Sequence, residues 1–217
     1  MFSGSQRFPP ALTPVVGVIL VSNILVYFVQ QQNSDPMVFR WGLWPWVEER
    51  EESFRPWQLL TYGWLHGNDQ HIIVNLFAVW MFGRTIEAIW GWKRFLTYYL
   101  VCVVGAGLIQ LVVATLAARS GDIYPTIGAS GGVFGLLLAF AMMFPNQKIL
   151  LLIPPIPLKA KYFVMIYGAI ELVLGITSLD TGVAHFAHLG GMFFGFVLIK
   201  FWKTKQVRQF TSEADYP

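Results

Sequence analysis

The chain has 217 residues, of which 55% are hydrophobic and only 12% are charged, and its mean hydropathy is +0.54. Soluble domains carry charge on about a quarter of their residues, so this composition excludes an ordinary soluble protein and indicates an integral membrane protein. The net charge of +3 does not indicate nucleic-acid binding, because the basic residues lie at the ends of apolar segments and form no stripe. The single cysteine, Cys102, excludes an intramolecular disulfide.

Apolar runs long enough to cross about 30 Å of hydrocarbon determine the expected architecture. They are Thr13–Gln31, His71–Ile89, Phe95–Ala118, Tyr162–Ser178 and Val183–Trp202. A shorter run begins at Ser130 and ends before Pro145. At about fifteen residues, or roughly 22 Å of helix, it cannot span the core alone. The sequence therefore predicts an all-α, polytopic bundle of six helices at 13–202, flanked by an N-terminal segment at 1–12 and a C-terminal tail at 203–217.

The basic residues predict the orientation of this bundle. With alternating spans, one side receives Arg7, Arg84, Lys93, Arg94, Lys148, Lys159, Lys161, Lys200, Lys203, Lys205 and Arg208. The other side receives Arg40, Arg50, Arg55 and Arg119. By the positive-inside rule, both termini are expected to be cytoplasmic.

Ser130 would then stand at the outward end of a helix that stops roughly 8 Å short of the outer surface. Non-helical backbone at such depth, here 121–129, is tolerated only where it is buried in protein or lines a water-filled cavity. The sequence predicts a wet depression inside the membrane with Ser130 at its floor.

All four histidines fall in two stretches, LHGNDQHIIVN at 65–75 and AHFAHLGGMFFG at 184–195. Polar residues within spans are costly and indicate function by default. His71 and Asn75 are four residues apart, and therefore share one helix face near its outer end.

The second stretch places His188, Gly191 and Gly195 on one face. Two glycines allow a neighbouring helix to approach closely, and Gly131 and Gly135 offer a matching small surface on the Ser130 helix. Docking these surfaces would bring Ser130 beside His188, which is the arrangement of a serine nucleophile and its base. His71 and Asn75 could then donate hydrogen bonds to a developing oxyanion.

Other interpretations of these residues compete. Taken alone, Ser130 would be interpreted as a small residue that packs between helices, because Gly-Ala-Ser-Gly is a common composition at helix contacts. The histidines could hold zinc, but HExxH is absent and no carboxylate lies within either helical cluster, Asp69 being placed in the preceding loop, so no metal is expected. His185 could compete with His188 as the base, and His66 is expected to support the second helix from a loop. Glu171, near the middle of the fifth span, is expected to face the bundle, protonated or hydrogen-bonded.

The chain resembles the rhomboid family of intramembrane serine proteases. The resemblance rests on GASG at 128–131, His71-x-x-x-Asn75 and Ala187-His188-x-x-Gly191-x-x-x-Gly195, in the family's order on three spans. It implies a six-helix fold with a Ser130 and His188 dyad that lacks the acidic third member of a triad. It also implies an oxyanion hole made by His71, Asn75 and the backbone N–H of Ser130.

Two positions depart from better-known bacterial members of that family. Gln58 follows Trp57 where an arginine often stands, which bears on the rigidity of the outer loop. Phe134 replaces a tyrosine, and can stack on His188 without donating a hydrogen bond. The supporting set is therefore Gly128, Gly131, Phe134, Gly135, Gly191 and Gly195.

The expected function is hydrolysis of peptide bonds in or next to transmembrane helices, without a cofactor, by a multi-pass protein of a bacterial cell membrane. The expected partners are transmembrane protein substrates and the lipid bilayer, and not nucleic acid. The rivals are an inactive relative that escorts membrane clients and a small-solute transporter. The sequence has no inverted repeat that would favour the transporter.

Overall fold

The computed structural model describes residues 10–150, 156–177 and 184–214, and for 204–214 it describes the helix alone. Within these ranges, five helical segments are long and apolar enough to cross a membrane. They are α1 (Pro14–Gln32), the segment Asp69–Trp90, α6 (Trp92–Ala118), α8 (Ala160–Thr177) and the part of α9 (His185–Ala214) up to Lys203. The shorter apolar helix is α7 (Ser130–Met143). The prediction of an all-α polytopic bundle with a short helix beginning at Ser130 is confirmed.

Some predicted boundaries cannot be compared with the structure, and others shift. The predicted span ends Ser178 and Val183 lie outside the described residues. Asp69 begins α4 (Asp69–Ala78), although the sequence analysis placed it in a loop. It is preceded by Asn68, whose side chain accepts a hydrogen bond from the backbone N–H of His71 (2.8 Å) and so caps the helix. The helix α9 continues to Ala214, through most of the predicted tail.

The second span is not a uniform α-helix. A π-helical turn, η2 (Val79–Gly83), separates α4 from α5 (Arg84–Trp90). Single π-helical turns of this kind occur inside α-helices, frequently at functional sites. Gly83 in this turn packs so closely on α1 that a Cβ there would lie 2.9 Å from Val16.

Short elements fill the connections. The loop between α1 and α4 contains α2 (Ser34–Trp41), α3 (Gln58–Thr61) and the 3₁₀ turn η1 (Tyr62–Trp64). After α7, β1 (Lys148–Leu150) pairs antiparallel with β2 (Pro157–Lys159). No strand was expected from the sequence, because three-residue strands are too short to show a period-2 pattern.

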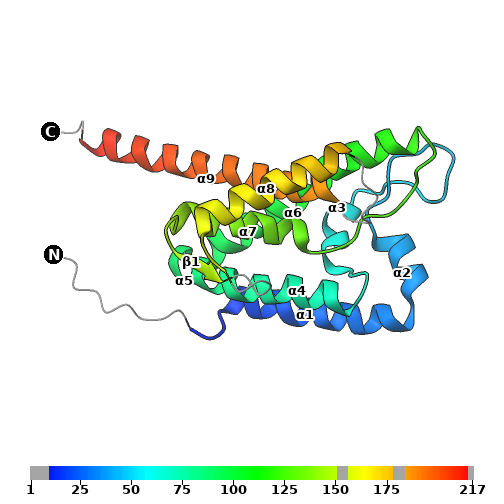
Figure 1. The fold of residues 1–217 in the computed structure, drawn as a ribbon, viewed down its shortest axis with the longest axis horizontal. Coiled ribbons are helices and arrows are strands. Elements are labelled where there is room, and N and C mark those ends of the chain that lie inside the picture. Colours follow the sequence, from blue (N-terminus) through cyan, green and yellow to red (C-terminus); the bar gives the residue numbers. More distant parts are fainter. Residues whose placement is uncertain (1–9, 151–155, 178–183, 215–217) are drawn as a thin grey trace.

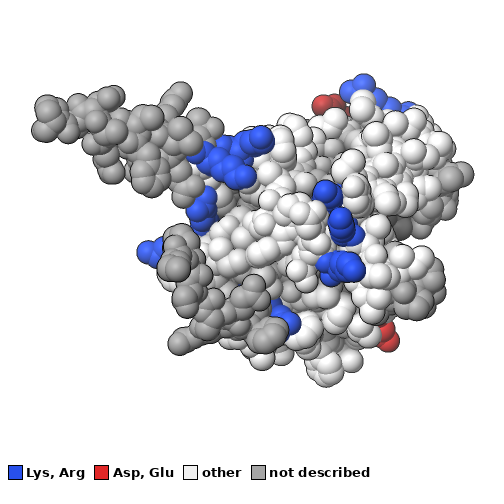
Figure 2. Space-filling view, turned by 60° about the vertical axis from the view of Figure 1, so that its left-hand side comes forward, with Lys and Arg blue, Asp and Glu red and all other residues white. Residues whose placement is uncertain are grey.

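The helix that begins at Ser130 lies at the centre of the bundle. α7 packs against α6 and α9, while α8 lies along α9 and α1 packs on the second span (Figure 1). The first turn of α1 and the far end of α9 lie at the same end of the molecule (Figure 1). Figure 2 turns this end toward the viewer. The face that it shows carries scattered Lys and Arg side chains and very few Asp or Glu side chains.

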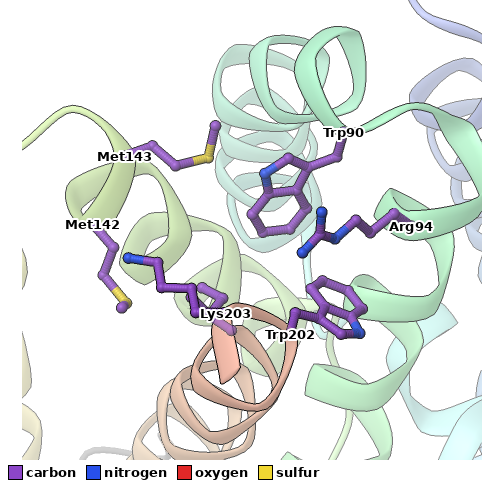
Figure 3. A pocket seen from close by; sticks show the side chains of 7 residues that line it. Trp90, Arg94, Met142, Met143, Trp202 and Lys203 are labelled. Atoms are coloured by element: carbon purple, nitrogen blue, oxygen red, sulfur yellow. The ribbon is translucent and has the colours of Figure 1, made fainter. Parts of the chain in front are cut away.

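Aromatic rings and an arginine join three helices at that end. Figure 3 shows the Arg94 guanidinium between the indoles of Trp90 and Trp202, at 5.7 Å and 4.3 Å from the ring centroids. These residues line a cavity of about 150 Å³ together with Met142 and Met143 at the end of α7. Since α7 is 14 residues long, this cavity lies roughly 20 Å from Ser130. It is separate from the histidine clusters.

A buried carboxylate fixes the start of α1. Glu87 of α5 accepts hydrogen bonds from the Thr13 hydroxyl (2.5 Å) and from the backbone N–H groups of Val15 and Val16 (both 2.9 Å). The first N–H groups of a helix have no partner within the helix, so Glu87 satisfies donors that would otherwise be unpaired in an apolar environment. One side chain therefore holds the first span against the second.

Glu87→Gln should lower the stability of the bundle by about 1–3 kcal/mol, because an amide NH₂ replaces one of the two oxygens that accept from the backbone N–H groups. The midpoint of thermal unfolding in detergent measures this effect. Glu48→Gln, at an exposed loop position, is the matched control and should leave the midpoint unchanged. An unchanged midpoint for Glu87→Gln would contradict the capping role.

Candidate active site

The backbone before α7 is held by hydrogen bonds to the loop between α1 and α4. Leu43 and Thr126 exchange backbone hydrogen bonds of 3.0 Å and 2.8 Å. The N–H of Gly128 donates to the carbonyl of Tyr62 (2.9 Å), and the Tyr62 hydroxyl donates in turn to the carbonyl of Val103 (2.7 Å). Non-helical backbone is thus paired with protein before the chain enters the helix at Ser130, as its depth requires.

The first residue of α7 meets α9. His188 Nε2 lies 2.8 Å from Ser130 Oγ, within hydrogen-bond distance. The contact requires a very close approach of the two helices, because a Cβ on Gly191 would collide with the carbonyl of Gly131. His188 is 7% exposed and Ser130 is half-buried. The sequence prediction that small residues bring these two side chains together agrees with this geometry.

The orientation of the His188 ring is fixed on one face by Phe134. The two rings stack with centroids 4.1 Å apart and planes inclined by 7°. Phe134 lies one turn after Ser130 on α7, so the same helix supplies the hydroxyl at the edge of the imidazole and the ring against its face.

Of the other two glycines, Gly135 also meets α9, since a Cβ there would lie 3.3 Å from the carbonyl of Gly191, but Gly195 does not meet α7. A Cβ on Gly195 would collide with the hydroxyl of Tyr98, and one on Gly135 would collide with the sulfur of Cys102. Both of these partners belong to α6, and the Tyr98 hydroxyl donates to the carbonyl of Gly135 (2.8 Å). The prediction of a single α7–α9 glycine surface is therefore wrong for Gly195, which instead makes room for α6.

The His71 ring lies against the backbone two residues before Ser130. A Cβ on Gly128 would be 2.8 Å from His71 Nε2, and Gly128 has φ +129°, a conformation that residues with a side chain rarely adopt. The N–H of Gly67 donates to His71 Nδ1 (3.3 Å). Because Nδ1 is the acceptor, the ring carries its proton on Nε2 and presents a donor on the side of Gly128.

Asn75 is buried on the same helix as His71. One N–H of its amide donates to the carbonyl of His71 (2.8 Å). A primary amide has a second N–H, so this bond leaves one donor for another group.

His66 is fully buried, and its ring meets the His71 ring edge-on with centroids 5.1 Å apart. Its backbone N–H and carbonyl bond to the side chain of Gln30 on α1. Burial, together with the nearby His71, lowers the pKa of His66 to about 4. His66 is therefore neutral at physiological pH and supports His71, in line with the structural role expected from its position in the loop.

Glu171 lies next to both histidines of α9. Its Oε2 accepts a hydrogen bond from His185 Nδ1 (2.7 Å) and lies 2.9 Å from His188 Nδ1. The second contact is close in distance but does not meet the angles of a hydrogen bond, and it is an ion pair only when His188 is protonated. The resemblance implied a dyad that lacks the acidic third member of a triad, and this geometry places a carboxylate beside His188.

Among the described residues, Glu171, His185 and His188 form the group whose donor atoms lie close enough to hold a metal ion. These atoms all lie within 4.8 Å of one another. Two histidines and a glutamate are a donor set that zinc accepts. Here the single oxygen Oε2 already contacts both ring nitrogens, so the donors satisfy one another directly.

The sequence carries one signal for the Glu171 contact, in the spacing of two glycines on α8. Gly168 and Gly175 lie three residues before and four residues after Glu171, and therefore share its helix face. A Cβ on Gly168 would be 3.3 Å from Met192, and one on Gly175 would be 3.0 Å from Phe186. This small-residue face packs α8 on α9 and turns the carboxyl toward the histidines.

Comparison with known proteins agrees with this arrangement. The family model described as "Rhomboid domain" matches residues 53–203, which is more than half of the chain. This chain belongs to the rhomboid family. The matched region includes α7, both histidine clusters and Glu171.

Several rhomboid proteins are similar to the chain in sequence. "Rhomboid protein 1, mitochondrial" of Saccharomyces cerevisiae is 32% identical over 145 residues, covering 66% of this chain and 41% of the yeast protein. "Presenilin-associated rhomboid-like protein A, mitochondrial" of Danio rerio is 33% identical over 129 residues, covering 58% and 32%. "Rhomboid protease GluP" of Bacillus subtilis is 29% identical over 145 residues, covering 64% and 25%. The match spans less than half the length of each of these relatives.

Gly128→Ala should destabilise the protein more than Gly121→Ala, as measured by thermal unfolding. Both glycines have positive φ, so both substitutions introduce backbone strain of about 1–3 kcal/mol. A Cβ on Gly121 has no neighbour within 4 Å, whereas one on Gly128 collides with the His71 ring and adds an overpacking cost of about 1–3 kcal/mol. Equal losses of stability in the two variants would show that a Cβ at position 128 does not clash with the His71 ring, and would contradict the close contact.

Proposed function

We propose that this rhomboid-family chain is an intramembrane serine endopeptidase that cleaves peptide bonds within or next to transmembrane helices. The observation that carries the proposal is the distance of 2.8 Å between Ser130 Oγ and His188 Nε2, on two helices that the family's small-residue motifs bring together. A hydroxyl in hydrogen-bond contact with a neutral imidazole is the arrangement that activates a serine nucleophile.

In the proposed reaction, Ser130 Oγ attacks the carbonyl carbon of the scissile bond while its proton passes to His188 Nε2. The carbonyl π electrons move onto the oxygen and form a tetrahedral oxyanion. His188 then returns the proton to the leaving amine, and the acyl group stays on Ser130. Water then attacks the acyl carbon and gives a proton to His188. The bond between that carbon and Ser130 Oγ breaks, His188 returns the proton to Oγ, and the carboxylic acid product leaves.

The oxyanion would be stabilised by donors that already surround Ser130. The backbone N–H of Ser130 is at the first turn of α7, where N–H groups lack acceptors within the helix and the helix dipole favours negative charge. The Nε2–H of His71 and the second N–H of Asn75 are the side-chain donors that we assign to the same role. Each such donor contributes roughly 3–4 kcal/mol in other enzymes.

The position of Ser130 also defines the substrate class. Helical peptide bonds hide their carbonyls in hydrogen bonds, so an attack on a membrane-spanning substrate requires local unwinding. We infer that substrates are transmembrane helices weakened by Gly, Pro or polar residues, with small residues at the cleaved bond. Substrate and water would meet at the outer end of α7, beside the exposed stretch 67–70 that precedes His71.

We assign the protease domain to 13–202, with 1–12 and 203–217 as flanking segments. We also infer that the protein is a bacterial rhomboid of the six-helix type. It would lie in the cell membrane with both termini in the cytoplasm. The excess of basic residues at the end where α1 begins supports this orientation. The similarity to the Bacillus protease supports a bacterial membrane, whereas the yeast and zebrafish relatives are named as mitochondrial.

Cleavage of a single-span substrate in proteoliposomes tests the proposed function. The wild type should cut, and Ser130→Ala and His188→Ala should each lower kcat by about 10⁴-fold or more, to the background of the assay. Gel and mass-spectrometric analysis of the products measures the rate and locates the cleaved bond.

Ser22→Ala is the matched control, because Ser22 is a partly buried serine of another span that bonds to the carbonyl of Ile19 and to the Trp64 indole. It should cleave at the wild-type rate. Substrate binding without cleavage by the wild type would favour the escort function instead. Cleavage that survives Ser130→Ala would exclude the proposed mechanism.

A further inference from the structure

The carboxylate of Glu171 completes a line of three groups across α7, α9 and α8. Ser130 Oγ is 2.8 Å from one nitrogen of the His188 ring, and Glu171 Oε2 is 2.9 Å from the other. Both the imidazole and the carboxyl are buried, at 7% and 8% exposure. A charge in such a place is costly, so its retention beside a ring that contacts the nucleophile needs an explanation.

Two features hold the carboxyl in this position. Gly168 and Gly175 let α8 approach α9 on both sides of Glu171. In addition, His185 donates to the same oxygen, Oε2, that faces His188 (2.7 Å). His185 stands one turn before His188, so it anchors the carboxylate at the height of the His188 ring.

The carboxylate determines which nitrogen of His188 carries the proton. A carboxylate is an acceptor only, so a neutral His188 beside it keeps its proton on Nδ1. The lone pair is then on Nε2, which faces the hydroxyl of Ser130. This is the tautomer that a general base requires, and the opposite tautomer would present a donor to the hydroxyl and could not accept its proton.

Proton transfer strengthens the contact further. When the proton of Ser130 moves to Nε2, His188 becomes a cation, and the carboxylate already lies 2.9 Å from its other nitrogen. The attraction between the two charges exists only after the transfer, so it stabilises the transition state more than the resting enzyme.

We propose that Glu171 is a positioning residue of the active site, which holds His188 in the base tautomer and stabilises its protonated form, with His185 as the anchor of the carboxylate. The site would thus work as a Ser130, His188 and Glu171 triad. The inference rests on the proposed function.

The test compares cleavage kinetics of the full chain in proteoliposomes for the wild type, Glu171→Gln and Glu171→Asp. Glutamine keeps the size of the side chain but has no charge, and its amide can donate to Nδ1 and favour the wrong tautomer. We expect kcat of Glu171→Gln to fall about 100-fold with KM unchanged. Glu171→Asp, which keeps the charge, should recover part of this loss.

Glu87→Gln is the matched control, since it makes the same chemical change at a buried carboxylate of another span. It should lower the unfolding midpoint and leave kcat of the folded protein unchanged. A loss of kcat in Glu171→Gln without a matching loss in Glu87→Gln therefore separates positioning from general destabilisation.

Each other outcome has a distinct meaning. Wild-type kcat in Glu171→Gln, alongside inactive Ser130→Ala, would overturn the positioning role and leave the proposed function intact. Equal kcat losses in the two Glu→Gln variants would reduce Glu171 to a structural role. A wild type that cleaves no better than Ser130→Ala would overturn the proposed function and this inference with it.

Discussion

The contact between Gly131 of α7 and Gly191 of α9 is the constraint on which the site depends. No other residue type fits on α9 at that point, since a Cβ would collide with the carbonyl of Gly131. Helices in lipid associate through such close backbone packing, because the lipid tails supply no hydrophobic drive of their own. The approach places Ser130 and His188, on facing turns, 2.8 Å apart. The histidine ring then stacks on one neighbour, Phe134, and contacts the carboxylate of another, Glu171.

A second constraint comes from the bilayer. A helix as short as α7 cannot cross the hydrocarbon core alone, and non-helical backbone within the core must be paired with protein or water. The chain meets this demand by bonding Thr126 to Leu43 and Gly128 to Tyr62, so the loop between α1 and α4 is part of the site's support. Gln58 contributes to this loop, because its buried side chain accepts from the backbone N–H of Arg55 (3.1 Å). A glutamine at this position is thus compatible with an ordered loop.

Much of this arrangement could be predicted from the sequence, for a physical reason. Span lengths follow from the thickness of the bilayer, so the helices and the shortness of α7 could be read from apolar runs. Histidines within spans are rare enough that their spacing alone indicated which faces meet.

Contacts between side chains on different helices were harder to predict. The partners of Glu171 depend on how α8 turns against α9, and Gly195 packs on Tyr98 of α6, a residue for which the pattern of small residues gave no signal. The three-residue strands β1 and β2 were too short for a pattern.

The central claim is that Ser130 is a nucleophile made reactive by His188 inside the membrane. Reaction with a fluorophosphonate probe, followed by peptide mapping in a mass spectrometer, tests it most directly because no substrate needs to be known. The account predicts one adduct, on Ser130, that forms in the wild type and is lost in His188→Ala. An unlabelled Ser130 in folded wild-type protein, or equal labelling in His188→Ala, would contradict it.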